Sequence, residues 1–226
     1  MLCLVVCTIV LSVLAYLTFP FDRKGWIVHR YARAWAWLIV KSCGVTVTLS
    51  GLDRIEKGRP QVFMANHQGA FDIFSLLAYL PVDFKWVARE EIFGIPILGW
   101  AMKAAGYISI DRKGRKKAVA SLERAVSRIR DGTSVLVFPE GTRSPDGRIH
   151  AFKKGGFTLA VKARVPIVPV SIWGSRDVLP RSSLRVRPGR IGIRVGQAIP
   201  TEGRTLADRS DLMEAVRRTI ETGIPG

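Results

Sequence analysis

A chain of 226 residues is long enough for one domain with a substantial hydrophobic core, and its 35 basic and 18 acidic side chains give a net charge of +17 at pH 7. This charge favours anionic partners such as nucleic acid, anionic lipid or phosphorylated substrates. Because the sequence has no zinc-finger spacing, no aromatic RNA-binding motif and no Cys-x-x-Cys pair, we expect no nucleic-acid partner and no metal site.

The first 21 residues contain no charged side chain. About 20 apolar residues at ~1.5 Å each match the roughly 30 Å hydrocarbon layer of a bilayer. Since no basic segment precedes this run, we expect a retained anchor rather than a cleaved signal peptide. Basic residues follow it closely, so the positive-inside rule predicts that the rest of the chain lies on the cytoplasmic face of the cell membrane.

A second segment, residues 26–40, mixes three tryptophans with His29, Arg30 and Arg33. This composition is typical of a helix at the lipid–water interface of an anionic membrane surface, and a helix buried against the domain is the alternative. Together the two segments predict an N-terminal hydrophobic membrane-docking helical element over residues 1–43, followed by one domain over residues 44–226.

After residue 43, β-branched runs alternate with amphipathic segments. This alternation predicts an α/β domain with a largely parallel central sheet flanked by helices. No glycine-rich nucleotide motif interrupts the pattern, so no cofactor is expected. Strands are expected at 45–50, 61–65, 84–88, 107–110, 134–138, 167–172 and 191–195, and helices at 71–80, 98–105, 115–130, 156–163 and 206–222.

His67 and Asp72 offer a base and a carboxylate that can orient it. Residues five apart on one helix are rotated by roughly 140°, so these side chains meet only if His67 lies in a turn before the helix that contains Asp72. Gln68 and Gly69 suit such a turn, and residues 71–80 suit the helix. An aspartate bonded to one imidazole nitrogen leaves the other free as a base. A structural histidine beside a helix-capping aspartate is the alternative.

A second segment, Phe138–Ser144 (FPEGTRS), puts a cation beside a glycine turn. Arg143 is the candidate phosphate ligand, because a guanidinium can make two hydrogen bonds to a phosphate, and Thr142 can add a hydroxyl. Glu140 would repel a phosphate, so we expect it to brace Arg143 or the glycine turn, or to contact a substrate hydroxyl. A base and an anion clamp together indicate chemistry on a phosphorylated alcohol.

These segments resemble the motifs of the glycerolipid acyltransferase superfamily, in particular the 1-acylglycerol-3-phosphate acyltransferases. Asn66–Asp72 matches the Asn-His-x4-Asp block of that family, Gly106–Arg112 its second block, Phe138–Ser144 its third and Val165–Val170 its proline-punctuated fourth. The four blocks occur in family order and cover roughly residues 60 to 175. The resemblance is weaker in the N-terminal segment and after Trp173.

The resemblance implies transfer of a fatty acyl group from acyl-CoA or acyl carrier protein to the sn-2 hydroxyl of lysophosphatidate, giving phosphatidic acid in phospholipid biosynthesis. It makes His67 the general base and Asp72 its orienting carboxylate. Because a thioester is already activated, neither a metal nor a cofactor is needed. Backbone N–H groups near Gly69 are candidates for holding the oxyanion. The residues implied to bind the acceptor are Glu140, Gly141, Thr142, Arg143 and Arg112.

Other interpretations remain open at this point. Arg112 can instead pair with Asp111, and Lys85 and Lys103 are either auxiliary phosphate contacts or solvated lysines. The acceptor can be another lyso-lipid, such as a lyso-ornithine lipid or a lysophospholipid, and a non-catalytic basic membrane-binding protein is the alternative outside the enzymes. Eight apolar residues either line an acyl tunnel or belong to the ordinary core. They are Phe74, Leu76, Leu77, Phe93, Ile95, Ile97, Leu98 and Trp100.

Overall fold

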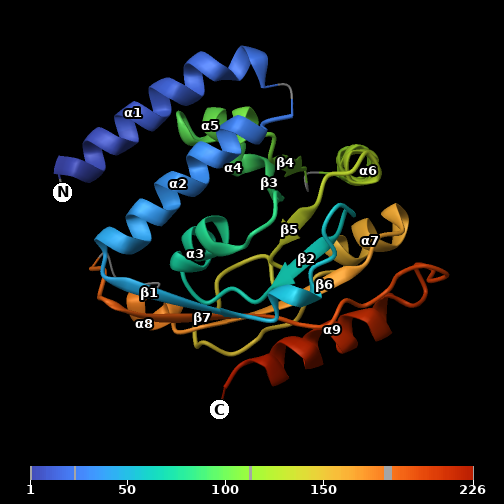
Figure 1. Ribbon diagram of the computed structural model, residues 1–226. Helices are drawn as coiled ribbons and strands as arrows, with labels where there is room; N and C mark the ends of the chain where they lie inside the picture. Colours follow the sequence, from blue (N-terminus) through green and yellow to red (C-terminus); the bar gives the residue numbers. More distant parts are fainter. Residues whose placement is uncertain (1, 23, 112–113, 181–184, 226) are drawn as a thin grey trace.

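The computed structural model describes residues 2–22, 24–111, 114–180 and 185–225. Within these residues, seven strands form one sheet in the order β1-β7-β6-β2-β5-β3-β4 (Figure 1). Every strand lies where the sequence pattern predicts one, within two residues at each end. The strands are β1 (Val45–Ser50), β2 (Val62–Ala65), β3 (Lys85–Arg89), β4 (Ile108–Ile110), β5 (Val135–Val137), β6 (Ile167–Trp173) and β7 (Gly189–Val195).

The five helices predicted after residue 43 are present as α3, α5, α6, α7 and α9, and two short helices, α4 and α8, were not predicted because four residues are too few to show a helical period. Two 3-10 turns, η1 (Phe19–Phe21) and η2 (Leu52–Arg54), complete the described elements. The helices are α1 (Leu2–Thr18), α2 (Trp26–Ser42), α3 (Phe71–Tyr79), α4 (Glu90–Phe93), α5 (Leu98–Ala104), α6 (Arg115–Arg130), α7 (Lys154–Ala163), α8 (Ser175–Val178) and α9 (Arg209–Gly223).

Five neighbouring strands, β6, β2, β5, β3 and β4, run parallel to one another. Strand β7 pairs antiparallel with β6 and parallel with β1, so these two strands run in the opposite direction. The predicted α/β fold with a largely parallel central sheet flanked by helices is therefore confirmed.

The central strands β2 and β6 bury both of their faces, whereas β1 exposes one face. In the central strands successive residues pack into opposite cores because side chains alternate along a strand. In β2, Phe63 and Ala65 join one core with α2 and α3, whereas Val62 and Met64 join a second core with α6, α7 and α9. All four of these side chains are fully buried. The loops that carry polar residues are thereby left at the ends of the strands.

Helices α1 and α2 form a hairpin along one side of the domain (Figure 1), and α2 packs against α3 and β1. Trp35 of α2 donates a hydrogen bond from Nε1 to Thr8 Oγ1 of α1 at 2.9 Å. Trp26 and Trp37 are exposed, whereas Ala36 and Val40 belong to the core. Helix α2 thus has one buried and one exposed face, and the boundary expected near residue 43 stays a prediction.

None of the helices in the described part of the chain combines the length and the apolar character needed to cross a bilayer.

The turn of this hairpin is anchored by a buried lysine. Lys85 of β3 is 1% exposed, and its Nζ donates to the Gly25 carbonyl at 2.8 Å and lies 3.3 Å from Asp83 Oδ1. Burial lowers the pKa of Lys85. Both predicted roles for Lys85, phosphate contact and solvated lysine, are therefore wrong, because its ammonium group is buried against the hairpin turn.

His29 of α2 lies in the same buried cluster, between the rings of Phe84 and Tyr107. Its Nε2 is 3.7 Å from Asp83 Oδ1, beyond hydrogen-bond distance. Burial, with the positive charges of Lys85 and Arg33, lowers the pKa of His29 from 6.5 to about 3 despite that carboxylate. The imidazole is therefore neutral in the folded protein at neutral and mildly acidic pH.

We predict that His29 makes the fold sensitive to acid. A folded-state pKa below the unfolded value stabilises the fold above pH 6.5, and this stabilisation is lost as pH falls from 6.5 towards 3. The free energy of unfolding should decrease by about 1.4 kcal/mol per pH unit in that range from this group alone. Denaturant unfolding of the wild type and of His29→Phe between pH 7 and pH 4.5 measures the difference. Parallel pH profiles for the two proteins would contradict the prediction.

Candidate active site

The chemically active segments meet at one edge of the sheet. His67 follows β2, and the segment Phe138–Arg143 follows β5, the strand paired with β2. Arg89 ends β3, and Asp111 follows β4. Because these strands are parallel, their carboxyl ends lie at the same edge, where open α/β sheets bind their ligands.

His67 and Asp72 are hydrogen-bonded as the spacing predicts. His67 lies in the loop after β2, Asp72 in the first turn of α3, and Nδ1 of the imidazole is 2.7 Å from Asp72 Oδ2. An ionised carboxylate only accepts, so Nδ1 carries the hydrogen and Nε2 is left as the basic nitrogen. Asp72 is 0% exposed and His67 9% exposed, so the pair is shielded while the imidazole still reaches the cavity described below.

Asp72 also orders the turn itself. Its Oδ2 accepts hydrogen bonds from the backbone N–H groups of Gln68 at 2.7 Å and of Gly69 at 2.9 Å. These two donors are among the N–H groups near Gly69 that were expected to hold the oxyanion, and for these two the expectation is wrong because the carboxylate already occupies them. The short loop and the carboxylate therefore fix each other.

Two contacts hold the turn against β6 and the segment after it. The Asn66 side chain accepts from the Ile172 N–H and donates to the Ile172 carbonyl, both at 2.8 Å. Gly69 lies against Ser175, where an added Cβ would be 2.7 Å from the Ser175 carbonyl oxygen. The glycine is thus required by the close approach of the two backbones.

The imidazole of His67 is stacked on an aromatic ring. The ring centroids of His67 and Phe138 are 3.9 Å apart and the planes are 9° from parallel. Phe138 in turn stacks on Trp86 of β3, with centroids 5.4 Å apart. No signal in the sequence indicated this contact, although Phe138 opens the segment that was expected to bind phosphate. The stack restricts rotation of the imidazole, whose Nδ1 is already held by Asp72.

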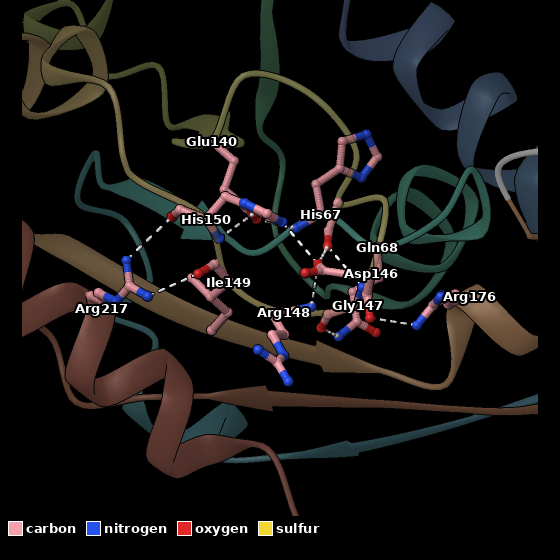
Figure 2. A network of polar contacts seen from close by, with 11 residues as sticks. His67, Gln68, Glu140, Asp146, Gly147, Arg148, Ile149, His150, Arg176 and Arg217 are labelled. Carbon is pink, nitrogen blue, oxygen red and sulfur yellow. Dashed lines mark hydrogen bonds and ion pairs between the residues drawn. The ribbon is translucent and has the colours of Figure 1, made fainter.

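Glu140 braces the loop that carries His67. Its Oε1 accepts from the His67 N–H at 2.9 Å and its Oε2 from the His150 N–H at 3.0 Å (Figure 2). Burial raises the pKa of the Glu140 carboxyl, against the lowering effect of these two hydrogen bonds. Glu140 is therefore placed as a brace of the His67 backbone rather than as the expected substrate contact, since backbone donors occupy both oxygens.

The loop after the glycine turn is tied to the same brace. Asp146 Oδ1 accepts from the Ser144 hydroxyl at 2.9 Å and lies 2.8 Å from His150 Nε2. The hydrogen bond from His150 contributes most to holding the pKa of Asp146 well below its usual range. Gln68 Nε2 donates to the Gly147 carbonyl at 3.1 Å, so the loop also contacts the His67 turn.

Two arginines clamp this loop from outside. Figure 2 shows Arg217 reaching it from helix α9 and Arg176 from the opposite side, while the His67 ring points away from the loop. Arg217 Nη2 donates to the Ile149 carbonyl at 2.8 Å, and Arg176 Nη1 donates to the Asp146 carbonyl. No sequence signal marks these contacts, because Arg217 is 68 residues from Ile149.

A cavity of about 1350 Å³ opens at His67. Its lining includes His67, Thr142 and Arg143 and many apolar side chains, among them residues of α1, α2 and α5. Five of the eight suggested tunnel residues line the cavity, namely Phe74, Leu77, Ile97, Leu98 and Trp100. The others do not: Leu76 and Phe93 are buried core residues, and Ile95 is exposed.

The expected phosphate-binding residues are divided by the structure. Gly141, Thr142 and Arg143 all line the cavity that His67 lines. Arg112, expected as a second positive contact, lies outside the described residues. Lys103 is exposed and does not line the cavity.

The family model described as Acyltransferase matches residues 46–173. A solved structure, the 1-acyl-sn-glycerophosphate (LPA) acyltransferase PlsC from Thermotoga maritima, aligns with a TM-score of 0.75 at 26% sequence identity and covers 95% of each chain. The structural likeness agrees with the fold described above.

Curated relatives give the same result. The chloroplastic 1-acyl-sn-glycerol-3-phosphate acyltransferase LPAT1 of Arabidopsis thaliana is 38% identical over 73% of this chain and 45% of its own length. Human 1-acyl-sn-glycerol-3-phosphate acyltransferase alpha is 34% identical over 79% of this chain and 64% of its own length. The chain thus spans about half to two thirds of the relatives it matches. Since the family model covers more than half of it, the chain belongs to the acyltransferase family.

Proposed function

We propose that the protein transfers a fatty acyl group from acyl-CoA or acyl carrier protein to the sn-2 hydroxyl of 1-acylglycerol-3-phosphate and so forms phosphatidic acid. The observation that carries this proposal is that an Asp72-oriented His67 and the cation Arg143 line one largely apolar cavity. The names of the relatives support the same acceptor.

The geometry supports general-base catalysis. Nε2 of His67 takes the proton of the acceptor hydroxyl while the hydroxyl oxygen attacks the carbonyl carbon of the thioester. A C–O bond forms and the carbonyl electrons move to oxygen. Collapse of this intermediate restores the carbonyl and breaks the C–S bond, and the leaving thiolate receives the proton from the imidazolium. Asp72 stabilises that imidazolium through Nδ1, at 2.7 Å.

The polar and apolar residues of the cavity suit different parts of the substrates. Arg143 and Thr142 offer a charge and a hydroxyl to the phosphate of the acceptor. The apolar walls contributed by α1, α2, α3 and α5 suit fatty acyl chains, because burial of methylene groups there removes apolar surface from water.

We further propose that α1 and α2 dock on an anionic membrane at the cytoplasmic face of the cell membrane. Support comes from the exposed apolar side chains that gather on these helices and from the exposed basic residues Lys24, Arg30 and Lys41 near them. The exposed apolar side chains are Val6, Ile9, Val10, Val13, Leu14, Tyr16, Leu17, Phe19, Phe21, Trp26, Ile27 and Trp37.

The reaction is tested with purified protein, lysophosphatidate and either acyl-CoA or acyl carrier protein as donor. We predict that His67→Ala lowers turnover by about 10²–10⁴-fold, because the base is lost while the turn stays held by Asp72. Product formation is measured as labelled phosphatidic acid, and the same assay with lyso-ornithine lipid and lysophospholipids examines the other acceptors. Turnover of folded His67→Ala protein near the wild-type value would refute the assigned role.

We predict that Arg143→Ala chiefly weakens acceptor binding. A charge-assisted contact contributes about 1.5–3 kcal/mol, which corresponds to roughly a 10- to 100-fold higher KM for lysophosphatidate. The KM for the thioester should change little. Initial rates with each substrate varied in turn measure both constants. If the thioester KM rises instead, Arg143 binds the donor.

We predict that the exposed face of α1 contributes to membrane binding without forming the cavity. The variant Ile9→Gln/Val13→Gln/Leu17→Gln alters three exposed side chains, whereas cavity-lining Leu11 and Ala15 are kept. Each aliphatic side chain transferred from water contributes up to about 1.5–3 kcal/mol, so sedimentation with anionic vesicles should weaken at least tenfold. Activity on a short-chain soluble acceptor should survive. The matched control Leu52→Gln/Leu206→Gln alters exposed leucines outside the hairpin, and equal loss of vesicle binding in both variants would contradict the prediction.

A further inference from the structure

We propose that Lys153 is a second cation for the substrate phosphate and that it acts together with Arg143 at the Gly141 turn. This inference rests on the proposed function and names a residue that the sequence motifs did not indicate. Lys153 precedes the first residue of α7, and its backbone N–H donates to the Pro139 carbonyl at 2.8 Å. That hydrogen bond ties the start of α7 to the phosphate-binding segment.

The side chain of Lys153 lies directly over the glycine turn. A Cβ added to Gly141 would be 3.1 Å from Lys153 Cδ and 3.2 Å from Nζ. Gly141 has φ +73°, in the left-handed region that favours glycine, and its N–H closes the turn on the Phe138 carbonyl at 3.0 Å. The missing side chain therefore leaves the ammonium group beside the backbone of a segment that lines the cavity.

A further basic side chain, that of Arg89, contacts the same turn. Arg89 donates to the Gly141 carbonyl at 2.7 Å, and no ion pair to Lys153 or Arg89 occurs among the described residues. The adjacent carboxylate, Glu140, directs both oxygens to backbone N–H groups. An anionic ligand would balance this charge.

The charges at the start of α7 support the same conclusion. Lys153 places a positive charge just before the helix, and the first turn of the helix has no acidic residue, although the helix dipole favours acidic side chains at this end. This distribution of charge does not stabilise the helix. It suits an anion held between the Lys153 ammonium and the Arg143 guanidinium.

The chemistry of the two substrates identifies the acceptor as the source of that phosphate. In lysophosphatidate only one methylene and the ester oxygen separate phosphorus from the carbon that carries the reacting hydroxyl. In acyl-CoA the whole pantetheine arm lies between the thioester and the nearest phosphate. Phe138, which opens the Gly141 turn, is stacked on the His67 ring, so the turn lies close to the base. The acceptor phosphate can therefore bind at the turn while the acceptor hydroxyl is at His67. A CoA phosphate is too far from the thioester to do so.

The test uses the full-length protein with Lys153→Met, which removes the charge and keeps an unbranched side chain. The KM for lysophosphatidate should rise about tenfold or more, with kcat and the KM for acyl-CoA changed less than about twofold. Lys153→Arg should restore most of the affinity. The matched control is Lys154→Met, which removes the same charge from the next residue, also exposed, and should leave the acceptor KM at the wild-type value.

A second measurement separates failure of this inference from failure of the proposed function. Calorimetric binding of lysophosphatidate and of its neutral analogue 1-acylglycerol to non-reacting His67→Ala protein is compared with and without Lys153→Met. The substitution should weaken binding of lysophosphatidate alone. If wild-type protein acylates lysophosphatidate but Lys153→Met behaves as Lys154→Met does in kinetics and binding, the inference is wrong and the proposed function stands. A rise confined to the acyl-CoA KM would also overturn the inference. If the wild-type protein shows no turnover, the proposed function fails, and the binding comparison alone tests the role of Lys153.

Discussion

The active site depends on the hydrogen bonds that one carboxylate oxygen, Oδ2 of Asp72, accepts. One buried atom accepts hydrogen bonds from the His67 imidazole and from two consecutive backbone N–H groups of the turn that carries it. Charge-assisted hydrogen bonds in a shielded setting are stronger than neutral ones, so the turn, the helix start and the imidazole form one rigid unit. The same contacts explain why these N–H groups cannot serve a developing oxyanion.

The sheet supplies the second constraint by setting which loops are neighbours. Strands β2 and β5 are paired, so the His67 turn and the glycine turn leave the sheet side by side. Each turn then fixes the other: Glu140 holds the His67 N–H, and the Ser144 N–H donates to the His67 carbonyl at 2.7 Å. In the proposed function, the base His67 and the phosphate ligand Arg143 consequently share one rigid frame, which is the preorganisation that catalysis by positioning requires.

The N-terminal hairpin packs on the α/β domain and forms part of the cavity wall. Lys85 fastens the hairpin turn to β3, and Ala15, Val28, Ala104 and Ala105 pack together beneath it. The same two helices line the cavity and present exposed apolar side chains. In the proposed function, one element therefore serves both membrane attachment and the chamber for acyl chains, while Arg143 binds the phosphate.

The sequence by itself determined the strands, the long helices, the family motifs and the placement of His67 in a turn before the helix of Asp72. These features depend on side-chain periodicity and on turn chemistry, which act over a few neighbouring residues. Only the tertiary structure decided that Glu140 braces His67 from 73 residues away, that Lys85 is buried and that Lys153 covers Gly141. Such partners are set by the order of strands in the sheet and by which helix covers which strand, and neither leaves a local pattern in the chain.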